Sequence, residues 1–264
     1  MDSVLSDILV TCIPGVVMVA LSLAASEIGY RIGRRLKAGA DDAMRSEIYT
    51  LQAATLALLA LLLGFSFSLG ASAYENRRRV ILNEASVIAK AHKRADLLPE
   101  PTRSEVRELL IQYIDTRLGL FYQGAFREHV VRAKLHESQR LQHEIWERAV
   151  TVAKQEPQSM PVGLAIEALS DMGDLNTQRV AALGQVMPPA MMIALALAAT
   201  VAMGWVGCGI GLGRRRNVAM PVVLSILFGF LIAIVIDLDQ PRHGIIRASQ
   251  RALTNLQETL RQVP

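Results

Sequence analysis

The sequence has few of the residues on which soluble enzymes and disulfide-rich proteins depend. Its 264 residues include two cysteines and five histidines, and only 5% of them are aromatic. It contains no HExxH, CxxC, GxSxG or Walker sequence, so the common signatures of zinc peptidases, disulfide oxidoreductases, serine hydrolases and P-loop nucleotide hydrolases are missing. We therefore expect a protein that is not an enzyme and that has no metal site and no cofactor.

The cysteines and the net charge also exclude two further classes. Cys12 and Cys208 both fall in apolar runs, so we interpret them as small buried hydrophobic residues, which say nothing of the redox compartment. The formal net charge is +4 and the pI is about 9.3. Much of this basic excess lies beside apolar runs, at Arg34, Arg35 and residues 214–216, where basic residues set membrane topology. Nucleic acid is therefore not an expected partner.

Long apolar runs are what the sequence has in abundance. Four of them, nearly free of charge, occupy residues 8–25, 51–69, 187–206 and 218–236. Each is close to the roughly 20 residues that a helix needs to cross a bilayer. Residues 1–7 lack the positive charge of a signal peptide, so we expect the first run to be retained as a membrane helix. The lipid bilayer is therefore the first expected partner.

The polar stretch between the second and third runs has the pattern of a helical domain. Apolar side chains at Ile81, Ala85 and Ile88 recur at helical spacing, and no helix breaker separates them from the second run. The predicted fold is thus an all-α membrane protein with four transmembrane helices, grouped two and two, and a helical extramembrane domain between helices two and three. The expected domains are 1–73 (helices one and two with a short basic loop), 74–186 (helical soluble domain), 187–237 (helices three and four) and 238–264 (an amphipathic C-terminal segment).

The second run is the best candidate for a pore-lining helix. Leu61, Phe65 and Leu69 are four residues apart and fall on one helix face, with the hydroxyls of Ser66 and Ser68 beside them. An apolar constriction next to hydroxyl groups suits gating by dewetting. An ordinary packed membrane helix explains the same pattern equally well. The third run is rich in glycine and alanine, which favours close contacts between helices.

Two carboxylates follow the fourth run. Asp237 and Asp239 lie at the expected membrane boundary, where an unpaired charge is costly. Arg77 and the two arginines after it leave the second run on the same side. We therefore expect ion pairs between these groups, and we favour this structural role over ion binding.

Three histidines recur every seven residues, at His129, His136 and His143. Neighbours in such a row are about 10 Å apart along a helix, too far for two of them in one chain to share a metal ion. In a symmetric ring, each position could form a circle of imidazoles that responds to pH. The favoured interpretation is an exposed polar face in which the histidines are incidental.

Several segments resemble the bacterial bestrophin-like domain membrane proteins: LLGFSFS (62–68), NEASVI (83–88), RADLLPEP (94–101), YIDTR (113–117) and DLDQPRHG (237–244). The resemblance implies a multi-pass protein of the bacterial inner membrane. The chain is also distantly similar to bestrophins, which are pentameric anion channels with four membrane helices and a helical cytosolic domain after the second. The positions that carry this likeness are Gly64, Phe65, Tyr74, Arg77, Asp237, Asp239 and Pro241.

The sequence also departs from the bestrophin pattern. Ser66 occupies the place of an arginine, Arg78 and Arg79 replace a pair of tryptophans, and Arg242 occupies the place of a phenylalanine. Our leading hypothesis is a symmetric homo-oligomer, a pentamer by analogy, in which the second helix lines a pore for small ions, anions by analogy. The alternative is a non-conducting membrane scaffold or sensor whose helical domain binds a partner.

The orientation in the membrane has two possible readings. The excess of basic residues in the two short loops predicts that these loops are cytoplasmic and that the helical domain lies outside. The bestrophin resemblance implies a cytoplasmic domain instead. We favour the charge rule slightly.

Overall fold

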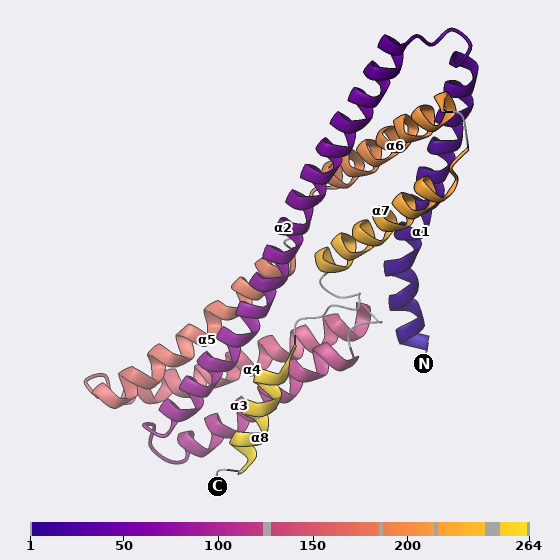
Figure 1. The fold of residues 1–264 in the computed structure, drawn as a ribbon. Helices are drawn as coiled ribbons and strands as arrows, with labels where there is room; N and C mark the ends of the chain where they lie inside the picture. The colour runs from indigo at the N-terminus through magenta and orange to yellow at the C-terminus, as the bar shows by residue number, and fades with distance from the viewer. Residues whose placement is uncertain (1, 124–127, 185–186, 214–215, 241–248, 263–264) are drawn as a thin grey trace. The chain divides into compact units, whose positions relative to one another are not determined.

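The computed structural model describes residues 2–123, 128–184, 187–213, 216–240 and 249–262. Over these ranges the chain forms eight helices and no strand (Figure 1). The predicted all-α fold class is therefore confirmed. The helices are α1 (Asp2–Leu36), α2 (Asp42–Ala95), α3 (Thr102–Gln123), α4 (Glu128–Gln155), α5 (Met160–Gly184), α6 (Pro189–Leu212), α7 (Ala219–Asp239) and α8 (Arg251–Gln262).

Among the described residues, four helices are long and apolar enough to span a membrane: α1, α2, α6 and α7. Helix α2 is a single uninterrupted helix of 54 residues, as predicted. At its start, the Asp41 carboxylate accepts a hydrogen bond of 2.8 Å from the Met44 N–H. A helix of this length extends about 80 Å, far more than the roughly 30 Å of a hydrocarbon core. We therefore assign only its apolar part, residues 51–69, to the membrane.

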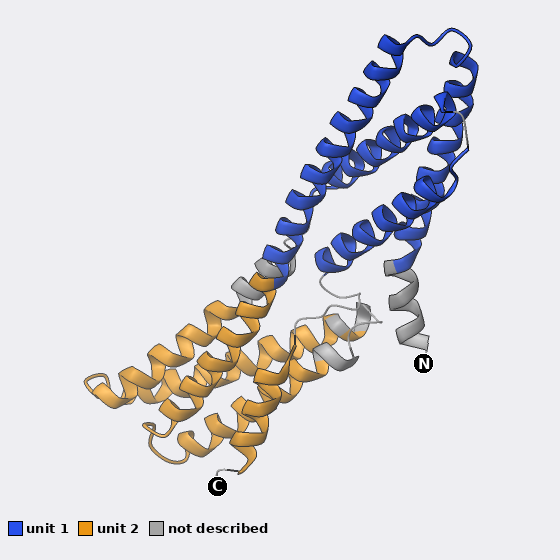
Figure 2. Ribbon diagram, in the orientation of Figure 1, with its two compact units in different colours: residues 1–74, 186–247 blue, residues 75–185, 248–264 orange. Residues whose placement is uncertain are grey.

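The chain divides into two compact units (Figure 2). Unit 1 comprises Met1–Tyr74 and Val186–Arg247, and unit 2 comprises Glu75–Gln185 and Ala248–Pro264. Helix α2 contributes to both units. Unit 2 also contains α8, which lies in the C-terminal segment expected at 238–264.

In unit 1, α1 packs against both α6 and α7. Glycines allow the backbones of α1 and α6 to come unusually close. A Cβ atom added at Gly29 would lie 1.9 Å from the Gly204 carbonyl oxygen, and one at Gly207 would lie 1.9 Å from the Ser26 carbonyl oxygen. The role in helix packing predicted for the third run is thus confirmed. Large buried side chains fill the rest of the core, among them Met18, Leu59, Leu63, Leu195, Met203, Phe228 and Ile232.

In unit 2, α4 packs between α3 and α5, and α8 packs against α3. The predicted apolar stripe on α2 is buried here, with Ile88 fully enclosed. Leu253 of α8 is also fully buried, and Arg261 of the same helix forms an ion pair of 2.8 Å with Asp115 of α3. Other members of this core are Leu110, Tyr113, Ile114, Ile145, Val162, Leu169 and Met172.

Candidate functional site

The pore candidates on α2 lie mostly on one exposed face of the helix. Leu61, Phe65 and Leu69 have 55%, 57% and 50% of their surface exposed, and Ser68 is exposed with them. At about 100° per residue, these four positions fall within an arc of roughly 100°. Gly64 adjoins the same face, and a Cβ atom there would meet nothing within 4 Å. This part of α2 therefore presents an apolar surface interrupted by one hydroxyl.

Ser66 takes a different place from its predicted companions. It is buried, about 140° around the helix from Leu61, and its hydroxyl donates a hydrogen bond of 2.8 Å to the Leu62 carbonyl oxygen. Its hydroxyl is thus engaged within α2. On the exposed face, the hydroxyl next to Phe65 and Leu69 is that of Ser68.

The carboxylates at the end of α7 lie in the interior of the protein. Asp239 accepts a hydrogen bond of 2.7 Å from the backbone N–H of Met187, just before α6 begins, so it ties the two helix ends together inside unit 1. Asp237 is buried as well. The remaining motif residues at this end, Pro241 and Arg242, lie outside the described residues.

The arginines that follow the apolar part of α2 have different surroundings. Arg78 and Arg79 are exposed and each forms an ion pair of 3.5 Å with Glu75, one helical turn away. Arg77 is buried, and Tyr74 is half-buried. The expected pairing of Arg77 with Asp237 or Asp239 would join the two units, and it stays a prediction.

The described histidines of the predicted row are exposed on α4. His136 and His143 both face solvent, and His143 lies 3.2 Å from a Glu147 carboxylate oxygen. The side chain of His129 lies outside the described ones. Among the described residues, no group of three or more His, Cys, Asp or Glu side chains could hold a metal ion. The proposed circle of imidazoles in a ring stays a prediction.

Sequence reasoning missed a buried ion pair in unit 2. The Arg117 Nε atom of α3 donates to the Glu84 carboxylate of α2 across 2.7 Å, and the Tyr113 ring lies 5.7 Å from the guanidinium carbon. The sequence does indicate that Glu84 is buried, because it lies between Ile81 and Ile88 on the apolar stripe of α2. On α3, the buried Leu110, Tyr113 and Ile114 form an apolar stripe at helical spacing, and Arg117 continues it. A charge inside an apolar stripe indicates burial with a partner.

The arrangement thus defines a helical membrane protein with an apolar exposed face on its longest helix, α2, and with buried carboxylates at the end of α7. Its sequence matches the bestrophin-like domain family over residues 19–253. The chain therefore belongs to the bestrophin-like family. No curated protein matches it.

Solved structures share this fold at low sequence identity. A mutant of a bacterial bestrophin homologue from Klebsiella pneumoniae is similar with a TM-score of 0.65 and 13% identity, over 94% of this chain and 97% of that one. Another crystal structure of that homologue gives a TM-score of 0.58 and 14% identity, over 95% and 97%. A mutant described as a membrane protein gives 0.67 and 14%, over 94% and 97%. These likenesses show the fold of the chain.

Proposed function

We propose that this protein is a homo-oligomeric membrane channel in which the exposed face of the apolar part of α2 lines a pore for small ions. The observation that carries the proposal is the face formed by Leu61, Phe65, Ser68 and Leu69. Large apolar side chains alternate there with a glycine and a hydroxyl. Rings of such side chains around an axis would make a narrow, poorly wetted constriction.

One α2 helix cannot enclose a pore, so the proposal requires several subunits arranged around an axis. Within one subunit, α1 packs on α6 and α7, and one face of α2 stays exposed. We propose that this exposed face of α2 lies against the same helix of neighbouring subunits. Cyclic symmetry places equivalent residues in rings. The bestrophin resemblance supports five subunits in the inner membrane of a bacterium.

Anions are the ions that we propose to permeate. Arg78 and Arg79 follow the apolar part of α2 on the same helix, and both side chains are exposed. In a ring of subunits, such guanidinium groups would concentrate anions near one end of the pore. Their ion pairs with Glu75 would weaken this effect without removing it, because exposed pairs are weakly held.

Ion flux into proteoliposomes tests the proposal, and α2 offers a matched pair of variants. Phe65 and Phe67 are 57% and 50% exposed, and they lie about 160° apart around the same helix. Phe65→Ala would widen the constriction, so we expect chloride flux to rise severalfold. Phe67→Ala removes the same volume from the opposite side, so we expect flux close to that of the natural protein.

Three outcomes would contradict the proposal. Equal effects of the two variants would show that the Phe65 side of α2 does not line a pore. Flux that favours cations would overturn the proposed anion selectivity. No flux from a folded, purified oligomer, over several salts and pH values, would leave the non-conducting scaffold or sensor as the better account.

A further inference from the structure

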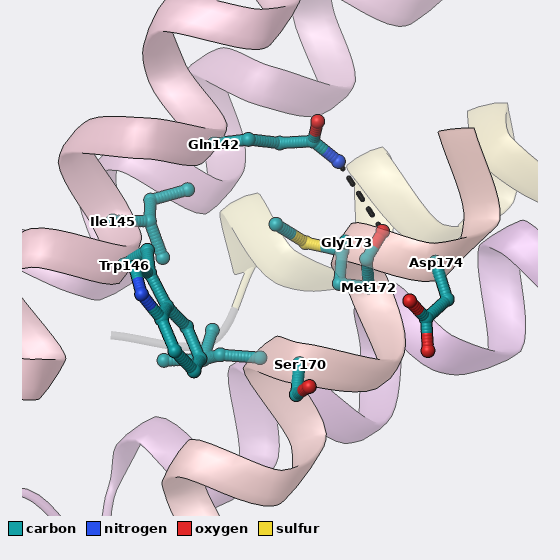
Figure 3. A pocket seen from close by; sticks show the side chains of 8 residues that line it. Gln142, Ile145, Trp146, Ser170, Met172, Gly173 and Asp174 are labelled. Atoms are coloured by element: carbon teal, nitrogen blue, oxygen red, sulfur yellow. Dashed lines mark hydrogen bonds between the residues drawn. The ribbon is translucent and has the colours of Figure 1, made fainter. Parts of the chain in front are cut away.

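A small cavity lies in unit 2 between α4 and α5. Its volume is about 210 Å³. Figure 3 shows Gln142, Ile145 and Trp146 of α4 on one side, and Met172, Gly173 and Asp174 of α5 on the other. Nothing in the proposed channel activity uses these residues.

One residue of the cavity wall is a glycine. Gly173 of α5 lies on its wall, and a Cβ atom at this position would meet no atom within 4 Å. Glycine lowers the stability of a helix interior relative to alanine, so its place in α5 has a cost in stability. A side chain added at Gly173 would therefore extend into open space.

The chemistry of the wall favours a ligand with positive charge. Among the residues whose side chains the structure describes, the cavity is lined by one carboxylate, from Asp174, and by no Lys, Arg or His. The Gln142 amide nitrogen donates to the Met172 carbonyl oxygen (3.2 Å) and to the Tyr113 hydroxyl (3.3 Å). With both amide hydrogens engaged, Gln142 can offer a ligand only its acceptor oxygen. An ammonium group, which is all donor, matches this lining.

The two ends of the cavity differ in polarity. Trp146 and Ile145 lie at one side and Asp174 at the other (Figure 3). The indole of Trp146 is partly exposed, whereas Ile145 is almost fully buried. An apolar chain against Trp146 and Ile145 would bury surface there, while a charged head would reach the carboxylate.

We propose that this cavity binds a small primary ammonium ion with a short apolar chain. The ammonium head bonds to Asp174 and the chain packs against Trp146. The site does not depend on ion conduction. It gives unit 2 a means of sensing an amine.

Binding can be measured on the full-length oligomer in detergent. The protein has two tryptophans, so a Trp205→Phe background leaves Trp146 as the single indole emitter. Butylammonium chloride is the probe. 1-Butanol is its uncharged counterpart, and sodium chloride at equal concentration controls for ionic strength and for chloride. We expect saturable quenching of Trp146 with butylammonium, at least about tenfold weaker binding of butanol, and no response to sodium.

Two variants locate the site. Asp174→Asn removes the charge but keeps the size of the side chain, so we expect at least about tenfold weaker binding. Gly173→Leu fills the cavity and should abolish binding. Its control is Gly163→Leu, also on α5 and also with open space at its Cβ, but outside the cavity. Both leucines raise the helix propensity of α5 alike.

The responses of the variants to the two probes test whether the cavity binds an ammonium ion. Binding that Gly173→Leu abolishes and Gly163→Leu preserves supports the proposal. Equal affinity for butylammonium and butanol would overturn the assignment of an ammonium ligand. Quenching that survives both Asp174→Asn and Gly173→Leu would overturn the site itself, as would no quenching at all.

Discussion

Arg117 and Glu84 form an ion pair of 2.7 Å in which each side chain is only 1% exposed. The pair joins α2 to α3 inside the core of unit 2, between the apolar stripes of the two helices. Taking both charges out of water is expensive, and their attraction offsets that cost only while both are present. The two residues should therefore behave as one unit in stability measurements.

Removing one partner of this pair should destabilise unit 2 strongly. Glu84→Gln leaves the Arg117 charge buried without its carboxylate, and we expect a loss of about 3–5 kcal/mol. The double variant Glu84→Leu, Arg117→Met should lose clearly less than the sum of its single changes. The differences in unfolding free energy can be measured on the full-length protein in detergent, with proteolysis of unit 2 as the readout of unfolding.

The control for this measurement is the exposed pair between Arg261 and Asp115, whose side chains are 56% and 41% exposed. Exposed pairs contribute about 0–1 kcal/mol, so Arg261→Gln should change stability little. A Glu84→Gln protein as stable as Arg261→Gln would contradict the role of the buried pair.

His92 should make the stability of unit 2 depend on pH. It lies on α2 beyond the apolar part of that helix, and Arg107 of α3 donates to its Nε2 atom across 3.4 Å. Burial of the imidazole lowers its pKa below the ordinary 6.5, the nearby Arg107 charge lowers it further, and Asp96 opposes this in part. Folding therefore disfavours the protonated form, and the unfolded chain binds more protons as the pH falls.

The stability of unit 2 should therefore decrease in acid. Stability should be full above about pH 6.5 and should decrease as the pH falls toward the lowered value of the folded state. His92→Gln keeps an acceptor for Arg107 but does not titrate, so its unfolding midpoint should change less between pH 7.5 and 5.5. His136→Gln, at an exposed position, should retain the pH dependence of the natural protein. Parallel pH profiles for all three proteins would exclude His92 as the cause.

The parts of the structure that sequence reasoning predicted are those set by local pattern. The apolar runs, the unbroken α2 and the stripe of Ile81, Ala85 and Ile88 depend on spacing along one helix. The Glu84–Arg117 pair and the Gln142–Met172 contact depend on which helix faces which, over 33 and 30 residues of sequence. Spacing marks Glu84 as unusual, but it does not name its partner. Ser66 shows the same limit, because its neighbours in sequence did not reveal which side of α2 is buried.

The close contact between α1 and α6 predicts which glycines tolerate a methyl group. Gly207→Ala would bring a Cβ atom to 1.9 Å from the Ser26 carbonyl oxygen, so the helices would have to separate. At Gly204 on the same helix, the nearest atom to a Cβ is 3.9 Å away, an ordinary contact. We expect Gly207→Ala to lower the yield and thermal stability of the folded protein sharply, and Gly204→Ala to leave both near their natural values. Equal behaviour of the two variants would contradict the contact.

The orientation of the protein in the membrane can be tested by labelling cysteines placed at two glycines. Gly39 lies in the short loop between α1 and α2, Gly163 lies on α5, and a Cβ atom at either would meet nothing within 4 Å. Each can therefore become cysteine in a Cys12→Ala, Cys208→Ala background. The basic residues of the short loops predict that a membrane-impermeant maleimide labels Gly163→Cys on intact cells, and that Gly39→Cys reacts only after permeabilisation. The reverse pattern would place unit 2 in the cytoplasm, as the bestrophin resemblance implies, and would show that loop charge does not set the topology of this chain.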